Sequence, residues 1–254
     1  MATLKPNSQP LRNPGQSGDE KIEKVIHDEF LTYYVVAMLL WLVALLEWIA
    51  NVLHLPRQPG LYVIFALAAT TFCIVQFIRT KRRVANLKKG RDGEREVAEL
   101  LDEFKQFGAS VLHDIPGKGG NIDHVVICSR GIFVIETKNW SKPREVWEMD
   151  FDGEQIHIAT RAPDAAPIIQ CRAQVSEIRS LLKESTSKAF PVRGAVVFLD
   201  WYVKRKPSAS GADIWVLNPK ELRGWIRQER DVLSDADVAM ATFHLKQFVK
   251  RLAA

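Results

Sequence analysis

The chain has 254 residues, of which 47% are apolar, and it carries a formal net charge of +5 with a pI near 9.1. This length accommodates one medium-sized domain plus an additional segment, and the apolar content is ordinary for a globular protein. The charge is compatible with nucleic acid or an anionic membrane surface and proves neither. The three cysteines lack metal-ligand spacing, so the sequence indicates a reducing compartment and no zinc site.

The first third of the chain has the composition of a membrane anchor. Residues 1–20 are rich in Pro, Ser, Gly, Asn and Gln, and we expect them to be disordered. Two apolar runs follow, Leu31 to Leu53 and Leu61 to Ile78, separated by a Pro- and Gly-containing turn. The second run has no charged residue, and eighteen helical residues span roughly 27 Å, close to the thickness of a hydrocarbon core. We therefore predict a transmembrane helical hairpin within residues 21–85.

The charges that flank the hairpin predict its orientation. Arg57 is the one strong cation in the turn, whereas six basic residues follow the second run: Arg79, Lys81, Arg82, Arg83, Lys88 and Lys89. The positive-inside rule places both termini and the C-terminal domain in the cytoplasm, with two helices in the inner membrane. Glu47, inside the first run, favours the alternative of a buried helical hairpin in a soluble protein.

Residues 86–254 show a mixed α/β pattern. A helix is expected from about Asp92 to Phe107, with Glu94 on its apolar stripe, and a strand from Ala109 to Ile115. Further downstream we expect an Asp-Gly hairpin at 145–158, a helix at 166–184, strands at 192–199 and 213–217, and helices from 219 and over 234–252.

The most informative segment is a predicted β-hairpin formed by residues 121–126 and 131–138. If its turn centres between Ser129 and Arg130, Asp123 faces Glu136 with Cβ atoms about 4.5–5.5 Å apart. Lys138 lies two residues beyond Glu136 and therefore on the same face. A bulge at Gly131 would shift this pairing by one residue. Two carboxylates on an otherwise apolar sheet need a compensating partner, and a divalent cation provides one.

Three segments together resemble a known family. They are Gly90-x-x-Gly93-Glu94, Gly120-Asn121-Ile122-Asp123-His124, and the run from Gly131 through Glu136-Thr137-Lys138 to Trp140. They resemble the NERD (nuclease-related) domain of the PD-(D/E)xK nuclease superfamily, over about residues 90–200.

This resemblance implies a restriction-endonuclease-like core, a mixed sheet flanked by helices. It implies Mg²⁺ or Mn²⁺ bound by Asp123, Glu136, the Thr137 carbonyl and Glu94. Lys138 would then orient the attacking water. Gln170 matches a glutamine of the family and is either an accessory residue of the site or a lone polar residue on its helix.

From these observations we expect a membrane-anchored, metal-dependent nuclease that hydrolyses phosphodiester bonds, with DNA expected rather than RNA. Two alternatives remain open: a non-catalytic nucleic-acid-binding module and a membrane scaffold that recruits a protein partner. The module would use the basic stretch from Lys81 to Arg91 and the triplet 204–206. His113 and His124 are expected to be satisfied strand residues, and Trp140 either stacks on a base or anchors a loop.

Overall fold

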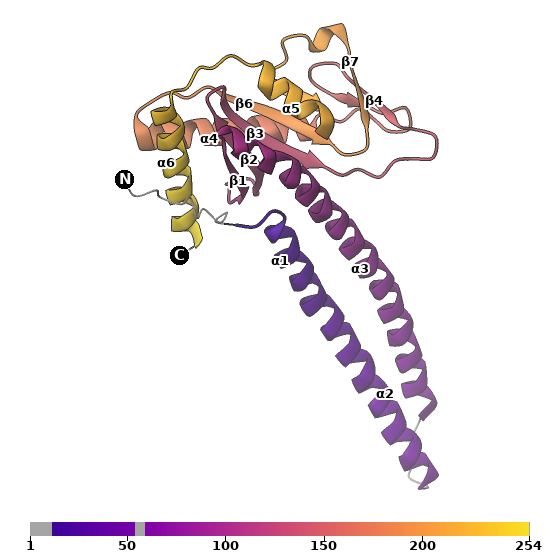
Figure 1. Cartoon of the computed structure of the whole chain (residues 1–254). Coiled ribbons are helices and arrows are strands. Elements are labelled where there is room, and N and C mark those ends of the chain that lie inside the picture. The colour runs from indigo at the N-terminus through magenta and orange to yellow at the C-terminus, as the bar shows by residue number, and fades with distance from the viewer. Residues whose placement is uncertain (1–11, 54–58, 254) are drawn as a thin grey trace. The chain divides into compact units, whose positions relative to one another are not determined.

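The computed structural model describes residues 12–53 and 59–253 (Figure 1). The chain divides into two compact units. One is helical and contains Gly18–Lys89; the other contains Gly90–Ala254 together with the residues before Gly18.

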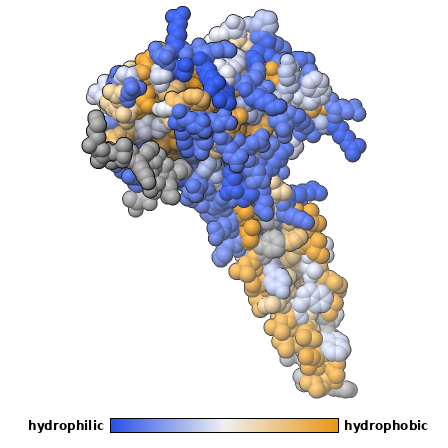
Figure 2. All heavy atoms as spheres, in the orientation of Figure 1, coloured by the Kyte–Doolittle hydropathy of each residue, from blue (hydrophilic) through white to orange (hydrophobic). Residues whose placement is uncertain are grey.

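The helical unit consists of long, largely apolar helices. Helix α1 (Gln16–Val25) continues through a π-helical segment (Ile26–Phe30) into α2 (Leu31–Val52), and α3 (Pro59–Asp102) follows. Trp41 Nε1 of α2 donates a hydrogen bond to Thr70 Oγ1 of α3 at 2.7 Å, and Thr80 Oγ1 of α3 donates to Glu29 of the π-helical segment at 2.7 Å. Polar contacts therefore join α3 to both α2 and the π-helical segment. Figure 2 shows the surface of this unit to be mostly hydrophobic.

Two expectations for this region are corrected. Residues 1–11 and the predicted turn at 54–58 lie outside the described residues, but α1 begins at Gln16, inside the segment expected to be disordered. The separate helix expected from Asp92 is instead the last part of α3, a single helix of 44 residues. No proline follows Pro59 within α3, and a glycine such as Gly90 costs a helix only about 1 kcal/mol.

The second unit is built on a five-stranded mixed sheet with the order β1-β2-β3-β6-β8. Strands β1, β2 and β3 are antiparallel neighbours, whereas β3, β6 and β8 run parallel. The bounds are β1 (Ser110–Ile115), β2 (Ile122–Cys128), β3 (Gly131–Lys138), β6 (Val192–Phe198) and β8 (Ile214–Leu217). The sheet thus has the mixed character that the sequence predicts.

Helices cover both faces of this sheet, and each face has its own apolar cluster. Helices α4 (Ala166–Thr186) and α6 (Asp235–Ala253) pack on one face with the side chains of Val125 and Val134. The end of α3, the 3₁₀ segment Glu103–Phe107 and α5 (Pro219–Gln228) pack on the other with Val126 and Phe133. The alternation along β2 and β3 therefore sends successive side chains to opposite helical layers.

A second sheet of three short strands lies outside the central one and has the order β5-β4-β7. Strands β4 (Glu148–Phe151) and β5 (Ile156–His157) form the expected Asp-Gly hairpin, and β7 (Tyr202–Arg205) pairs parallel to β4. Sequence reasoning missed β7 and treated residues 204–206 as a basic patch. Lys204 is hydrogen-bonded to Glu148 and Arg205 to Glu221, so two of these charges are neutralised.

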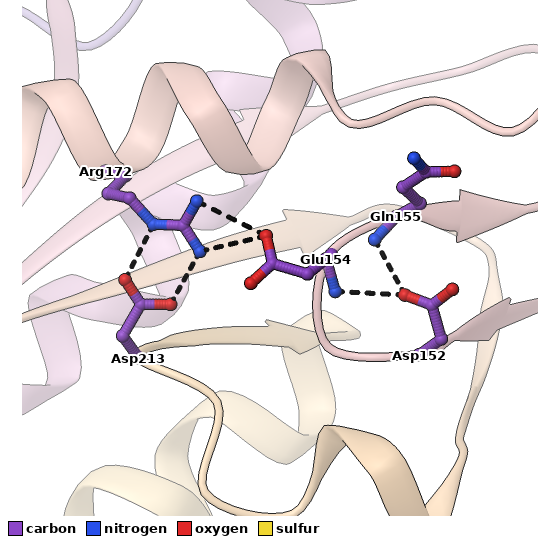
Figure 3. A network of polar contacts seen from close by, with 5 residues as sticks. All are labelled: Asp152, Glu154, Gln155, Arg172 and Asp213. Carbon is purple, nitrogen blue, oxygen red and sulfur yellow. Dashed lines mark hydrogen bonds and ion pairs between the residues drawn. The ribbon is translucent and has the colours of Figure 1, made fainter.

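A polar network ties this second sheet to the central one (Figure 3). Arg172 of α4 binds both oxygens of Asp213 at 2.7 and 2.9 Å, just before β8, and reaches Glu154 of the β4–β5 turn at 3.4 Å. Asp152 accepts the backbone N–H groups of Glu154 and Gln155, which closes the turn and holds the pKa of the Asp152 carboxyl below its ordinary value. The β4–β5 turn is therefore held by Asp152 from within and by Arg172 of α4 from outside.

Candidate active site

The β2–β3 hairpin has the register that the sequence predicts. His124 pairs with Ile135 and Cys128 with Gly131, so a two-residue turn of Ser129 and Arg130 joins the strands. Gly131 has φ of 132°, which glycine adopts without strain. Continued by one residue, this register sets Asp123 opposite Glu136, at the point where the regular ladder ends.

At the open end of the hairpin, Asp123 is hydrogen-bonded to β3 through its side chain and not through its backbone. Its Oδ2 accepts the backbone N–H of Thr137 at 2.7 Å. Burial raises the pKa of Asp123 well above its ordinary value, and the nearby carboxylates of Glu136 and Glu94 raise it further. The Thr137 N–H and the Lys138 ammonium act in the opposite direction but do not cancel the increase. The charged form of Asp123 is therefore disfavoured at this site, by burial first and by the neighbouring carboxylates second.

Glu136 lies at the centre of a hydrogen-bonded cluster and its side chain is almost fully buried. One of its oxygens, Oε1, accepts Lys138 Nζ at 2.5 Å, and the other, Oε2, accepts Gln174 Nε2 at 2.7 Å. Lys138 Nζ also donates to Gln170 Oε1 at 3.0 Å. Strand β3 and helix α4 thus hold the carboxylate and the ammonium group in a defined arrangement.

Sequence reasoning found Gln170 but missed Gln174. The two glutamines are four residues apart on α4, so they occupy one face of the helix, directed at β3. Gln174 also donates to the carbonyl of Asn121 at 3.4 Å and thereby joins the site to the loop before β2. The one available sequence signal was a second glutamine at helical spacing on an otherwise apolar stripe.

Thr137 and Glu94 are placed differently from the other site residues. The side chain of Thr137 is buried, and its Oγ1 has no hydrogen-bond partner among the described residues. Glu94 lies well inside α3, not in the first turn of a helix as expected, because α3 begins at Pro59. It is half-buried, and its charge acts on Asp123.

A complete metal centre is not formed by protein side chains alone. Among the described residues, no group of three or more His, Cys, Asp or Glu side chains has the arrangement of a metal site. Asp123 and Glu136 nevertheless fit a hard cation. Mg²⁺ is commonly held through one or two carboxylates while it keeps several waters, and a carboxylate has about four acceptor positions. Each Glu136 oxygen accepts one hydrogen bond from a described side chain, which leaves room for a further ligand.

His113 and His124 lie on the opposite face of the sheet from Glu136. They pair across β1 and β2 with their Nδ1 atoms 2.9 Å apart, and both rings are buried. Both residues lie on strands, as expected, but Nε2 of His124 has no hydrogen-bond partner among the described residues, so that ring is only partly satisfied. Trp140 packs edge-on against Phe198 with ring centroids 4.9 Å apart, which favours the anchoring role over base stacking.

The mixed sheet flanked by helices fits a nuclease-like α/β core. Residues 89–199 match the profile of the family described as nuclease-related domain, NERD. The chain therefore contains a domain of the NERD family, which belongs to the PD-(D/E)xK-like nuclease superfamily. Both carboxylate-bearing strands of the hairpin and the whole of α4 fall inside the matched range.

Two individual proteins show more limited similarity. An uncharacterized protein of Bacillus anthracis is 39% identical over 57 residues, which cover 20% of this chain and 27% of that protein. The structure of SfsA from Pyrococcus furiosus in complex with Ca²⁺ is 18% identical, with a TM-score of 0.27 over 50% of this chain and 54% of that chain. A likeness this distant carries no argument about fold or function.

Proposed function

We propose that this chain is a membrane-anchored, metal-dependent nuclease that hydrolyses phosphodiester bonds of nucleic acid, DNA in preference to RNA. The observation that carries the proposal is the cluster at the end of the β2–β3 hairpin. Asp123, Glu136 and Lys138 come together there within a nuclease-related domain. Such a combination of acids and a base at one end of a sheet suits phosphodiester hydrolysis.

The raised pKa of Asp123 supports the metal requirement, because burial first, and then the carboxylates of Glu136 and Glu94, disfavour a charge that a bound cation would stabilise. Asp123 and Glu136 would hold the cation, with the Thr137 carbonyl and Glu94 as further ligands. When bound, a divalent cation polarises a phosphoryl oxygen and lowers the pKa of bound water.

Lys138 supplies a fixed positive charge at the same place. Its ammonium is held between Glu136 and Gln170, so the side chain is oriented before substrate arrives. A preoriented cation can position the attacking water and stabilise the negative charge that develops on the phosphoryl group. Gln174 positions Glu136 from the other side and does not reach the reacting atoms in this role.

The helical unit supports the membrane anchor. Two helical stretches, Gln16–Val52 and Val63–Phe107, are long and apolar enough to cross a bilayer by length and composition. Only 6% and 11% of their most apolar windows are buried in the protein, which disfavours the soluble buried hairpin. By the positive-inside rule, the basic residues from Arg79 to Lys89 support an orientation with both termini and the nuclease domain on the cytoplasmic side of the inner membrane.

The proposal is tested with the full-length chain purified in detergent. Labelled single- and double-stranded DNA and RNA are incubated with Mg²⁺, Mn²⁺ or EDTA. We expect cleavage that requires a divalent cation and is lost in Asp123→Asn and in Lys138→Ala. Glu184→Gln and Lys183→Ala serve as matched controls, because they remove exposed charges of α4 and should cleave as the unaltered chain does.

Each alternative predicts a different result. A binding module would retain nucleic acid in a salt-sensitive manner in EDTA, show no cleavage with either cation, and be unaffected by Asp123→Asn. A scaffold would neither bind nor cleave nucleic acid. Either result contradicts the nuclease proposal, and the four substrates show which nucleic acid is cleaved if it holds.

A further inference from the structure

A pocket of about 500 Å³ lies at the other end of the central sheet from Lys138. It is lined by the first residues of β3 and of β6, including Ile132 and Val192, which pair with each other. Ile132 precedes Glu136 by four residues, which corresponds to roughly 13 Å along a strand. The pocket is therefore separate from the carboxylate cluster.

Four arginines from four different segments line this pocket: Arg130 of the β2–β3 turn, Arg179 of α4, Arg193 of β6 and Arg230 after α5. Among the described residues that line it, Glu229 is the one acidic side chain. No described residue forms an ion pair with Arg179, Arg193 or Arg230, and Arg130 lies 3.9 Å from Asp231. The pocket thus carries a clear excess of positive charge.

The walls of the pocket are held together by direct hydrogen bonds. Ser129 Oγ donates to Asp231 at 2.5 Å, and the Ser129 carbonyl accepts the N–H groups of Val232 and Leu233 at 2.7 and 2.8 Å. Arg130 Nε donates to the Glu229 carbonyl at 3.1 Å. The segment after α5 is therefore fixed against the β2–β3 turn, so the pocket is formed before any ligand arrives.

Two of the guanidinium groups are themselves positioned. Arg179 Nη2 donates to the Val192 carbonyl at 3.0 Å. The guanidinium of Arg193 lies 5.0 Å from the centre of the ring of Trp215, which lines a neighbouring pocket that Arg193 shares. A guanidinium has five N–H donors, so each of these groups keeps donors for a ligand. Like charges gathered in a preformed pocket repel one another, and an anion that binds there relieves the repulsion.

We propose that this pocket is a binding site for a phosphate-bearing ligand, separate from the hydrolytic site. Guanidinium groups bind phosphate through paired N–H···O contacts, and four of them suit a group with several charged oxygens. The volume lies within the range of small-molecule pockets, larger than one phosphate requires. A free nucleoside triphosphate and the terminal or backbone phosphates of a nucleic acid share this chemistry.

Binding is measured by calorimetry on the full-length chain in detergent, with EDTA present to prevent cleavage. The probes are ATP, inorganic triphosphate and a short 5′-phosphorylated oligonucleotide. In Arg179→Gln/Arg230→Gln, both altered side chains are exposed, so folding should be retained. We expect this variant to weaken binding by at least about tenfold, since charge-assisted contacts are lost. Arg227→Gln removes a charge outside the pocket and should bind as the unaltered chain does.

The probes distinguish the source of the phosphate. ATP and triphosphate weakened together identify a free nucleotide, whereas an effect on the oligonucleotide alone identifies nucleic acid. If no probe binds, or if Arg227→Gln has the same effect as the double variant, the pocket is not a phosphate site. Because the readout is binding without metal, this result is independent of whether the chain is a nuclease.

Discussion

Lowering the pH from about 7.5 to about 5 is expected to destabilise the α/β unit through His113 and His124. Both rings are buried, and burial lowers the pKa of each imidazole below its ordinary value of 6.5, that of His124 by the larger amount. His113 lowers the pKa of His124 further, and the Nδ1 atoms of the two rings are 2.9 Å apart. Asp102 raises the pKa of His113 and Lys105 lowers it, and neither outweighs burial.

The direction of the change in stability with pH depends on whether the folded or the unfolded chain binds the proton. Between the lowered pKa in the folded chain and about 6.5 in the unfolded chain, only the unfolded chain takes up the proton. The stability is therefore fully present above about pH 6.5 and is lost as the pH falls toward the folded-state pKa. For a ring that stays neutral to pH 5, this amounts to about 2 kcal/mol, at about 1.4 kcal/mol per pH unit.

Hydrogen exchange at the amides of β2 measures the opening free energy of this unit by itself. The comparison is with His113→Leu/His124→Leu, because replacing both hydrogen-bonding partners by apolar groups is nearly neutral for stability. The raised pKa of Asp123 has the opposite effect on stability and is common to both proteins, so it cancels in the difference. An equal loss of protection in both proteins at low pH would refute the reasoning.

Three further substitutions test the packing around the site, each by the free energy of unfolding. Gln174→Leu removes the 2.7 Å hydrogen bond to buried Glu136 and should cost about 1.5–3 kcal/mol; no loss would mean that Glu136 finds another donor. Gly194→Ala places a methyl group 2.7 Å from Cys171 Sγ and should cost about 1–3 kcal/mol through overpacking, whereas a neutral result would show that α4 yields easily. Asn218→Ala removes the capping box of α5 and should cost about 1 kcal/mol, and an unchanged stability would contradict the capping role.

Local patterns were sufficient to predict much of the α/β unit. The apolar runs and the short turn at Ser129 and Arg130 predicted the β2–β3 register, because a two-residue loop allows one pairing. That register also set Asp123 and Glu136 at adjoining places on two strands. The stripe of α4 was visible in the same way, since its apolar residues recur at helical spacing.

The features that sequence reasoning missed depend on contacts between distant segments. Strand β7 is four residues long and pairs parallel to β4, a partner more than fifty residues earlier that its own pattern does not indicate. The triplet 204–206 was assigned a binding role only in the binding-module alternative, and Glu148, the partner of Lys204, lies on that same distant strand. Gln174 contacts Glu136 only because α4 crosses β3. The periodicity of a sequence predicts which face of a helix or strand a residue occupies. It does not predict which other element packs against that face.

Divalent-cation binding at the end of the β2–β3 hairpin is the measurement that tests the proposed site most directly. Mn²⁺ is titrated into the full-length chain in detergent and followed by electron paramagnetic resonance, with Asp123→Asn and the control Glu184→Gln in parallel. We predict that the unaltered chain and Glu184→Gln bind Mn²⁺ and that Asp123→Asn loses this binding. No binding by the unaltered chain, or equal binding by Asp123→Asn, would contradict a metal-dependent site built on Asp123 and Glu136.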